Sequence, residues 1–162
     1  SYSFDVVSEF DHQELVNAID QLRREVDQRY DLKDSKTKID IKEDELSIVS
    51  LSDMTIESVK DILLQKATKR NLSLKIFDFQ KIETIGGNMV MQIVKLKKGL
   101  SQEISKKLSK LVRDNMKKVT ASIQGDSLRI TGKNKDDLQA AINLIKKQEE
   151  ELDIALQFQN YR

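Results

Sequence analysis

The 162-residue sequence contains no cysteine, which excludes disulfide bonds, thiolate metal sites and cysteine nucleophiles. It also contains no proline, which excludes proline-rich linkers and proline-rich ligand motifs. No apolar run approaches the roughly 20 residues that a membrane span requires, and residues 1–10 are typical of a strand and not of a signal peptide. We therefore expect a soluble, cytoplasmic protein that makes no membrane contact.

Neither sign of charge dominates, because 28 basic residues nearly balance 27 acidic ones. No field of the whole molecule attracts the chain to nucleic acid, so any phosphate-binding surface must be a local patch. The single histidine, His12, has no second histidine at ligand spacing, and no nucleophile stands beside a base. We expect a binding protein with no catalytic residue, metal ion or cofactor, and not an enzyme.

Strand and helix periodicities follow one another in the same order twice along the chain. The first cycle predicts a strand at Ser3–Ser8, a helix from Asp11 to about Tyr30, a hairpin of Thr37–Lys42 and Glu45–Ser50, a helix opening at Asp53 or Thr55, and a strand at Leu72–Phe79. After Gly86-Gly87-Asn88, the second cycle predicts a strand at Met89–Leu96, a helix at Ser101–Met116, a hairpin of Val119–Gln124 and Ser127–Thr131, a helix from Asn134 to Gln148, and a strand at Ile154–Phe158.

A shift of 82 positions places matching residues of the two cycles on each other, which favours a tandem repeat. The matches are Ile41 with Ile123, Asp44 with Asp126, Leu46 with Leu128, Ile48 with Ile130, Ile56 with Leu138 and Leu74 with Leu156. Each cycle has the order β-α-β-β-α-β, which predicts a four-stranded antiparallel sheet with two helices on one face. The predicted fold class is α+β, with two ferredoxin-like domains.

The sheet faces without helices are predicted to be polar and almost free of aromatic residues. They carry Asp40, Lys42, Ser47 and Val49 in the first copy, and Ser122, Gln124, Arg129 and Thr131 in the second. Leu46–Ser50 and Leu128–Gly132 lack the glycine and aromatic pattern with which RNA-recognition motifs stack bases. Base stacking of that kind therefore has no side chains to use on these faces.

Lysines cluster around the start of the second copy. In Lys97-Lys98-Gly99-Leu100-Ser101 a glycine turn leads into a helix, which places backbone N–H groups beside two cations and suggests a phosphate site. The alternative is that these are ordinary solvated lysines in a common strand-to-helix turn. Neither the phosphate-loop pattern nor the three-glycine dinucleotide fingerprint is present.

Three separated segments resemble the bacterial YajQ family of nucleotide-binding proteins over essentially the whole chain. They are residues 3–9 (SFDVVSE), residues 121–126 (ASIQGD) with Thr131-Gly132-Lys133 and Asp136–Gln139, and residues 158–162 (FQNYR). The resemblance implies that the first strands of two ferredoxin-like domains are exchanged. The domains would then be residues 9–96, completed by the strand Met89–Leu96, and residues 1–8 plus 97–162.

The resemblance also implies a nucleotide ligand, with cyclic di-GMP or another purine nucleotide as the specific hypothesis, and a transcription regulator as a partner. Arginine suits a guanine edge because its planar fork can bond O6 and N7 together. The expected ligand-binding residues are Arg129 and Arg162 for guanine, Lys97, Lys98 and Lys133 for phosphate, and Gln124 and Asp126 for polar base contacts. Purely structural roles remain open for Gly125-Asp126, as a hairpin turn, and for residues 131–133, as a bend.

Two other classes of function remain open at this point. One is RNA or tRNA binding through the lysine cluster, without aromatic stacking. The other is a protein-interaction adaptor whose open sheets bind a partner or a sister chain. Salt discriminates between a long RNA and a compact nucleotide, because affinity for RNA falls steeply as salt is added.

Overall fold

A computed structural model describes residues 1–162 and divides them into two compact units. The central unit is Phe10–Lys97, and the terminal unit combines Ser1–Glu9 with Lys98–Arg162. The domain boundaries that the resemblance implies, residues 9–96 and residues 1–8 plus 97–162, stay a prediction. None of the helices has the length and apolar composition needed to cross a membrane.

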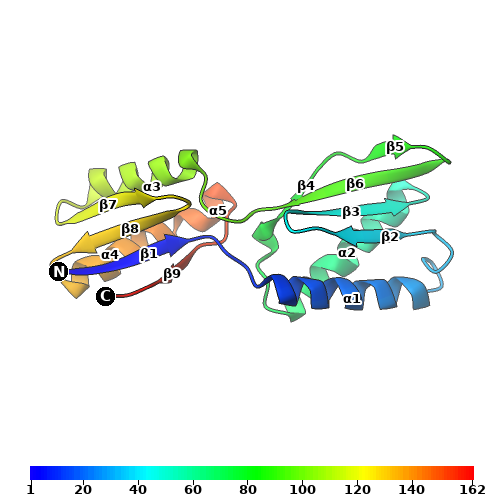
Figure 1. Ribbon diagram of the computed structural model, residues 1–162, viewed down its shortest axis with the longest axis horizontal. Helices are drawn as coiled ribbons and strands as arrows, with labels where there is room; N and C mark the ends of the chain where they lie inside the picture. The colour runs from blue at the N-terminus through cyan, green and yellow to red at the C-terminus, as the bar shows by residue number, and fades with distance from the viewer. The chain divides into compact units, whose positions relative to one another are not determined.

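The central unit is a five-stranded antiparallel sheet with two helices on one face (Figure 1). The strand order is β2-β3-β6-β4, and β5 also pairs with β6. The elements are α1 (His12–Gln28), β2 (Lys38–Ile41), β3 (Glu45–Ser50), α2 (Asp53–Lys69), the 3-10 turn η1 (Leu74–Ile76), β4 (Phe77–Phe79), β5 (Glu83–Ile85) and β6 (Met89–Leu96). The hairpin β2-β3 and both helices occur where the sequence predicts them.

Helix α1 begins at Asp11, whose carboxylate accepts hydrogen bonds from the N–H groups of Gln13 and Glu14. Helix α2 is capped by Ser52, whose hydroxyl accepts a hydrogen bond from the N–H of Thr55 in a capping box. Its first residue is Asp53, one of the two predicted positions. The apolar stripes of the two helices pack on alternate residues of β3 and β6 to form the core of the unit.

The predicted strand Leu72–Phe79 is wrong in its first half. Residues 74–76 form the turn η1 because the Ser73 hydroxyl accepts a hydrogen bond from the N–H of Lys75, and only β4 joins the sheet. Leu74 is 43% exposed whereas Leu156 is buried, so this pair of the proposed repeat is not equivalent. The strand β5 was not predicted.

The segment Gly86-Gly87-Asn88, expected to separate the two copies, lies instead in the hairpin between β5 and β6. Gly87 and Asn88 have φ angles of 74° and 61°, the left-handed conformation that glycine and asparagine adopt most readily in tight turns. The sheet of the central unit therefore has five strands and not four.

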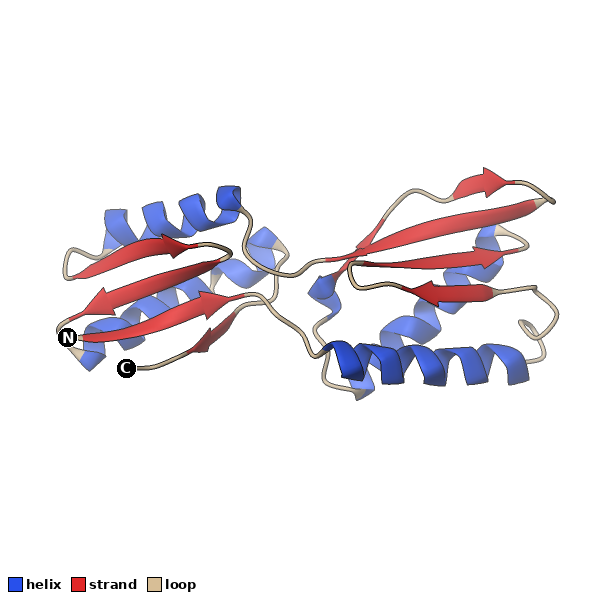
Figure 2. Cartoon of the chain, viewed as in Figure 1, coloured by secondary structure: helices blue, strands red, loops and turns tan.

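The terminal unit has a four-stranded sheet in the order β7-β8-β1-β9, with helices on one face (Figure 2). Its elements are β1 (Tyr2–Val7), α3 (Gln102–Asn115), β7 (Val119–Gln124), β8 (Ser127–Gly132), α4 (Lys135–Lys146), α5 (Gln148–Leu152) and β9 (Gln157–Gln159). Strand β1 lies between β8 and β9 and is antiparallel to both. Phe4 faces Ile130 in this pairing, and both side chains are completely buried in the core beneath the helices.

The predicted helix from Asn134 to Gln148 is instead two helices, α4 and α5, which meet at Lys147. Asn134 occupies the N-cap position of α4, but its amide donates to Asp137 Oδ2 and makes no cap hydrogen bond. Asp153 ends α5 in the left-handed conformation, with φ of 49°. The last strand starts at Gln157, because the buried residues 154–156 pack in the core without pairing in the sheet.

The segment that follows β9 continues alongside β1 and contains one residue more than the stretch of β1 that it pairs with. Asp5 lies opposite Gln159, while Ser3 exchanges both backbone hydrogen bonds with Arg162 at 3.1 and 3.0 Å. Two steps along β1 therefore match three along its partner, which is a β-bulge. Asn160 accommodates the bulge with φ of 56°, and this turns its side chain towards Asp5.

Candidate functional site

The open face of the terminal sheet has a buried carboxylate at its centre. Asp5 is 6% exposed, and its two oxygens accept hydrogen bonds from Arg129 Nε at 3.0 Å and Asn160 Nδ2 at 3.0 Å. The hydrogen bond from Arg129 lowers the pKa of the Asp5 carboxyl below its usual value, and it outweighs burial, which acts in the opposite direction. Asp5 is therefore held as an anion.

Arg162 is the second cation near this carboxylate, and its charge also lowers the pKa of Asp5. The two arginines expected to recognise guanine therefore lie around one acidic side chain. Arg129 has its Nε edge occupied by Asp5, and its side chain is 33% exposed. The rest of the row across the strands is polar, with Ser122 opposite Arg129 and Gln159 opposite Asp5.

The predicted phosphate turn uses its N–H groups within the fold. Gly99 N–H donates to the carbonyl of Ser8 at 2.6 Å, and Leu100 N–H donates to the carbonyl of Asp126 at 2.8 Å. The Asp126 carboxylate also lies against Gly99, where an added Cβ would be 2.7 Å from Oδ2. An anion already occupies the side of the turn where a phosphate was expected.

The structure does not bring all the predicted ligand-binding residues to one place. Gln124 and Asp126 lie at the β7-β8 turn, where Gln124 Nε2 donates to Ser122 Oγ. Lys133 follows the opposite end of β8. Lys98 opens the second segment of the terminal unit, whereas Lys97 belongs to the central unit and its N–H donates to the carbonyl of Ile76.

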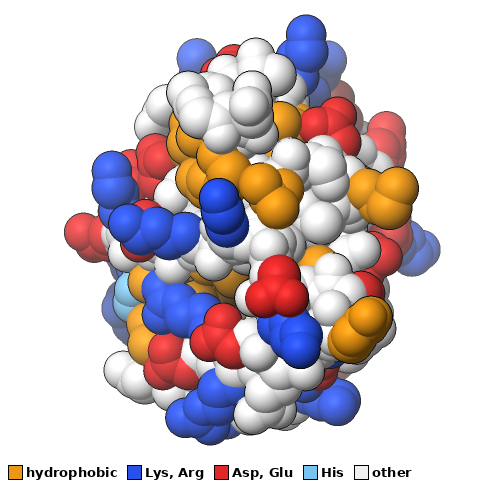
Figure 3. Space-filling model, turned by 90° about the vertical axis from the view of Figure 1, so that its right-hand side faces the viewer, with side chains coloured by type: hydrophobic (Ala, Val, Ile, Leu, Met, Phe, Trp, Pro, Cys, Tyr) orange, Lys and Arg blue, Asp and Glu red, His pale blue; other side chains and the backbone are white.

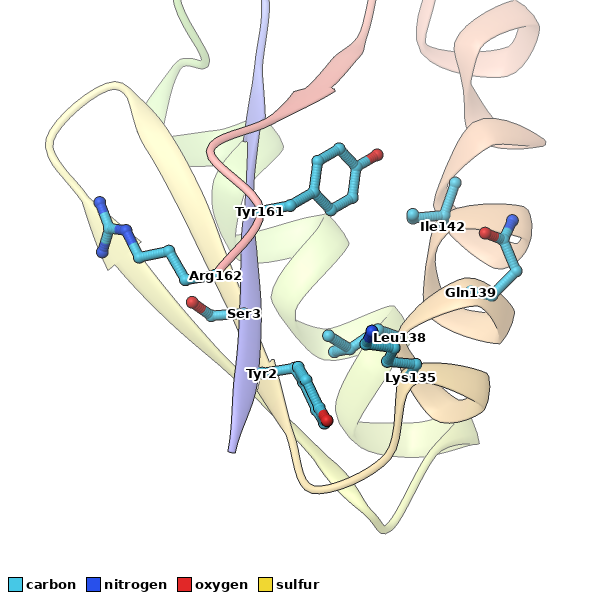
Figure 4. Close-up of a pocket in the computed structure, with 8 residues that line it drawn as sticks. All are labelled: Tyr2, Ser3, Lys135, Leu138, Gln139, Ile142, Tyr161 and Arg162. Carbon is cyan, nitrogen blue, oxygen red and sulfur yellow. The ribbon is translucent and has the colours of Figure 1, made fainter.

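A pocket of about 450 Å³ lies beside the start of β1, on the side that faces α4 (Figure 4). The sequence predicted Arg162 as a site residue, but not the other residues of this pocket. We call it the tyrosine pocket; it is lined by Tyr2, Ser3, Lys135, Leu138, Gln139, Ile142, Tyr161 and Arg162. Figure 4 shows both tyrosine side chains on the α4 side of β1, and the Arg162 side chain on the opposite side.

The tyrosine pocket combines aromatic rings, an apolar wall and a cation. Lys135 Nζ lies 5.2 Å from the centre of the Tyr2 ring, and the Tyr161 ring centre lies 6.0 Å from that of the buried Phe4. Leu138 and Ile142 supply apolar surface from α4, and Gln139 supplies an amide. Tyr2 and Tyr161 are 39% and 63% exposed, so both rings are available to a ligand.

Sequence reasoning missed this pocket because its walls come from the two ends of the chain and from a helix between them. The available signal was the family resemblance, since Ser3, Leu138, Gln139, Tyr161 and Arg162 all lie in the segments that carry it. No three histidine or acidic side chains gather in a way that could hold a metal ion. The arrangement therefore offers stacking, apolar contact and positive charge.

Comparison with known proteins gives one family over nearly the whole chain. The family model described as "Nucleotide-binding protein YajQ-like" matches residues 2–162. A Prochlorococcus marinus (strain NATL1A) protein named as nucleotide-binding is 99% identical over 162 residues, which are 100% of this chain and 98% of the relative. Similarly named proteins from Synechococcus strains CC9605 and JA-3-3Ab are 70% and 57% identical, each over 100% of this chain and 98% of the relative. The chain therefore belongs to the YajQ-like family.

Proposed function

We propose that this chain binds a purine nucleotide in the tyrosine pocket of the terminal unit. The observation that carries the proposal is the presence of two accessible tyrosine rings and a lysine around one apolar wall. A volume of about 450 Å³ falls within the range of roughly 300–1,000 Å³ that is usual for small-molecule sites. The names of the relatives, which describe nucleotide binding, support the same class of ligand.

The base of the nucleotide would stack on Tyr161, with Leu138 and Ile142 covering its other surfaces. Aromatic stacking contributes about 1–3 kcal/mol per base and is available to every base, so it gives affinity without much selectivity. The Gln139 amide carries one donor group and one acceptor, which allows it to bond a purine edge. Selectivity for a purine would come from this amide and from the length of the apolar wall.

The phosphates would lie near Lys135 and Lys133, at the start of α4. A second hollow is lined by both lysines and by Tyr2, but Asp136 and Asp137 line it as well. Those two carboxylates oppose a heavily charged phosphate chain. A ligand with isolated single charges suits this surface better than a nucleoside triphosphate does.

Cyclic di-GMP is the specific nucleotide that we propose, since each of its two phosphates carries a single negative charge. Its second guanine would reach the open face of the same sheet, where Arg162 and Arg129 are the proposed contacts. Lys97, Lys98, Gln124 and Asp126 are less favoured as contacts because they lie away from this pocket. An effector role through a transcription regulator would follow from such binding.

Two ferredoxin-like domains with exchanged first strands, which arose from a tandem repeat, are the proposed framework of this function. The pairing of β1 with β8 and β9, and of β6 with β3 and β4, supports the exchange. The matching registers of the two hairpins support the repeat: Ile41 faces Leu46 in one, and Ile123 faces Leu128 in the other.

Isothermal titration of the full chain with cyclic di-GMP, GTP and a short single-stranded RNA, at low and moderate salt, tests the proposal. Tyr161→Ala should weaken binding of the dinucleotide about tenfold, given the stacking energy above. Tyr30→Ala is the matched control, because Tyr30 is 90% exposed in the central unit and has a lysine, Lys33, at 5.5 Å from its ring centre. Unchanged affinity in Tyr161→Ala would contradict the proposed site.

The RNA titration separates the nucleotide from its main rival. A compact ligand touches few charges, so its affinity should change little between the two salt concentrations. Binding of the RNA alone, with an affinity that falls steeply as salt is added, would instead support an RNA-binding protein. Absence of heat with every ligand would overturn nucleotide binding and favour an adaptor.

A further inference from the structure

The face of the central sheet that is turned away from α1 and α2 was predicted to be polar, and this is wrong: it carries a continuous apolar stripe, because β5 and β6 add their own alternating apolar residues to it. Its members are Val49, Leu51, Ile85, Met89, Met91 and Ile93, all exposed or half-buried. Val49 faces Met91 across β3 and β6, and Ile85 faces Met89 across β5 and β6, so the side chains are direct neighbours. Figure 3, which looks along the long axis of Figure 1 and not onto this face, shows hydrophobic side chains at the surface among charged side chains of both signs.

The edges of the same face carry opposite charges. On the β2 edge, Lys38 and Lys42 flank Asp40, and on the far edge Glu83 and Asp78 stand on β5 and β4. The register places the two lysines and the two acidic residues of the far edge in two rows across the sheet, while Asp40 lies in a third row between them, opposite Ser47. One row reads Lys38, Val49, Met91, Glu83, and the other reads Lys42, Glu45, Lys95, Asp78.

We propose that this face binds the same face of a second copy of the chain, related by a two-fold axis that runs parallel to the strands. Such an axis reverses the order of strands while it keeps each row opposite itself. Lys38 then meets the partner copy's glutamate at position 83, and Val49 meets the methionine at position 91. In the other row, all four charged residues meet a residue of opposite sign.

The match between opposite charges identifies a second copy of the chain as the partner that binds this face. The apolar stripe lies on the central strands, so the axis brings it against itself, while the lysine edge covers the acidic edge. At every charged position of the two rows, the residue therefore faces a residue of opposite charge in the second copy. The inference does not depend on the tyrosine pocket, which belongs to the terminal unit.

The size of the face predicts a reversible dimer. Four strands about 4.8 Å apart span roughly 20 Å, which places the contact at the small end of specific protein interfaces. Association should therefore depend on protein concentration. Sedimentation velocity or light scattering over a dilution series measures it directly.

The test uses charge reversal at the two edges. Lys38→Glu alone places glutamate against Glu83 at two symmetry-related contacts, and Glu83→Lys alone places lysine against Lys38. Each variant should dissociate about tenfold more readily than the unaltered chain. An equimolar mixture of the two variants should form a heterodimer, because glutamate at 38 of one then meets lysine at 83 of the other.

Rescue in the mixture separates this contact from damage to the fold, since both sites are exposed and the variants must also keep their circular dichroism spectra. Met91→Lys, which places charge in the apolar stripe, should abolish association. Met54→Lys is its control, because Met54 is 78% exposed on α2 and lies off this face. A chain that stays monomeric at every concentration, or a mixture that gains nothing over its components, would overturn the proposal.

Discussion

Replacement of Arg129 by alanine should destabilise the terminal unit because it leaves a buried carboxylate with one partner. Arg129 Nε donates to Asp5 Oδ1, and after truncation only the amide of Asn160 remains on that side chain. Asp5 is held ionised at neutral pH, so its charge stays in the sheet. The cost comes from the unpaired charge and not from the lost contact alone.

The magnitude lies between two limits. Exposed ion pairs contribute about 0–1 kcal/mol, while removal of one partner from a fully buried pair costs about 3–5 kcal/mol. The Asp5 side chain is 8% exposed and that of Arg129 is 33% exposed, so water reaches one member of the pair only. We expect the free energy of unfolding of the terminal unit to fall by about 2 kcal/mol, which raises its unfolding equilibrium constant about thirtyfold.

Hydrogen exchange followed by mass spectrometry can locate this effect, because peptides from β1 and β8 report on the terminal unit alone. Their exchange should become about thirtyfold faster in Arg129→Ala, while peptides from β3 and β6 stay unchanged. Arg113→Ala is the control, since that side chain is 72% exposed beside Asp114 and should change little. Equal acceleration in both units, or none in β1, would refute the reasoning.

Three further predictions follow from contacts within single units. The pKa of Asp5 is lowered in the fold, so the stability it provides is present above its unfolded value of about 3.9 and is lost as pH falls through the folded value. The free energy of unfolding, measured by denaturant titration, should therefore fall less between about pH 6 and 3 in Asp5→Asn than in the unaltered chain. Gly99→Ala should reduce the free energy of unfolding by about 1–2 kcal/mol and so lower the melting temperature, because Gly99 has φ of 82° and the new Cβ would meet the Asp126 carboxylate. An unchanged melting temperature would count against this contact. Ser52→Ala should destabilise α2 by about 1 kcal/mol in urea titrations, and Ser52→Asp should restore most of it.

Local periodicity predicted the helices α1, α2 and α3 and the hairpins β2-β3 and β7-β8, because those elements depend on neighbouring residues. The helix α1 and the strands β3, β7 and β8 follow directly from apolar spacing and turn residues. The turn η1 and the strand β5 escaped prediction because a serine hydroxyl and a positive φ angle decided the local structure there. Alternation of apolar residues cannot report either effect.

Long-range pairing was beyond the reach of periodicity. Asp5 and Arg129 are separated by 124 residues, and only the family resemblance suggested that their strands are close. The placement of β1 in the sheet of the terminal unit was expected from that resemblance, whereas the tyrosine pocket was not expected at all. Tyr2, Lys135 and Tyr161 meet through the placement of β1, which no local pattern in the sequence encodes.

The position of β1 also determines the order in which the two units can fold during translation. This strand is translated before the central unit, whereas its neighbours β8 and β9 are translated after it. The central unit is continuous in sequence and can fold once Lys97 has emerged. Strand β1 must wait unpaired through that interval, with Phe4 and Val6 still exposed, and these are the residues that a nascent-chain chaperone would meet.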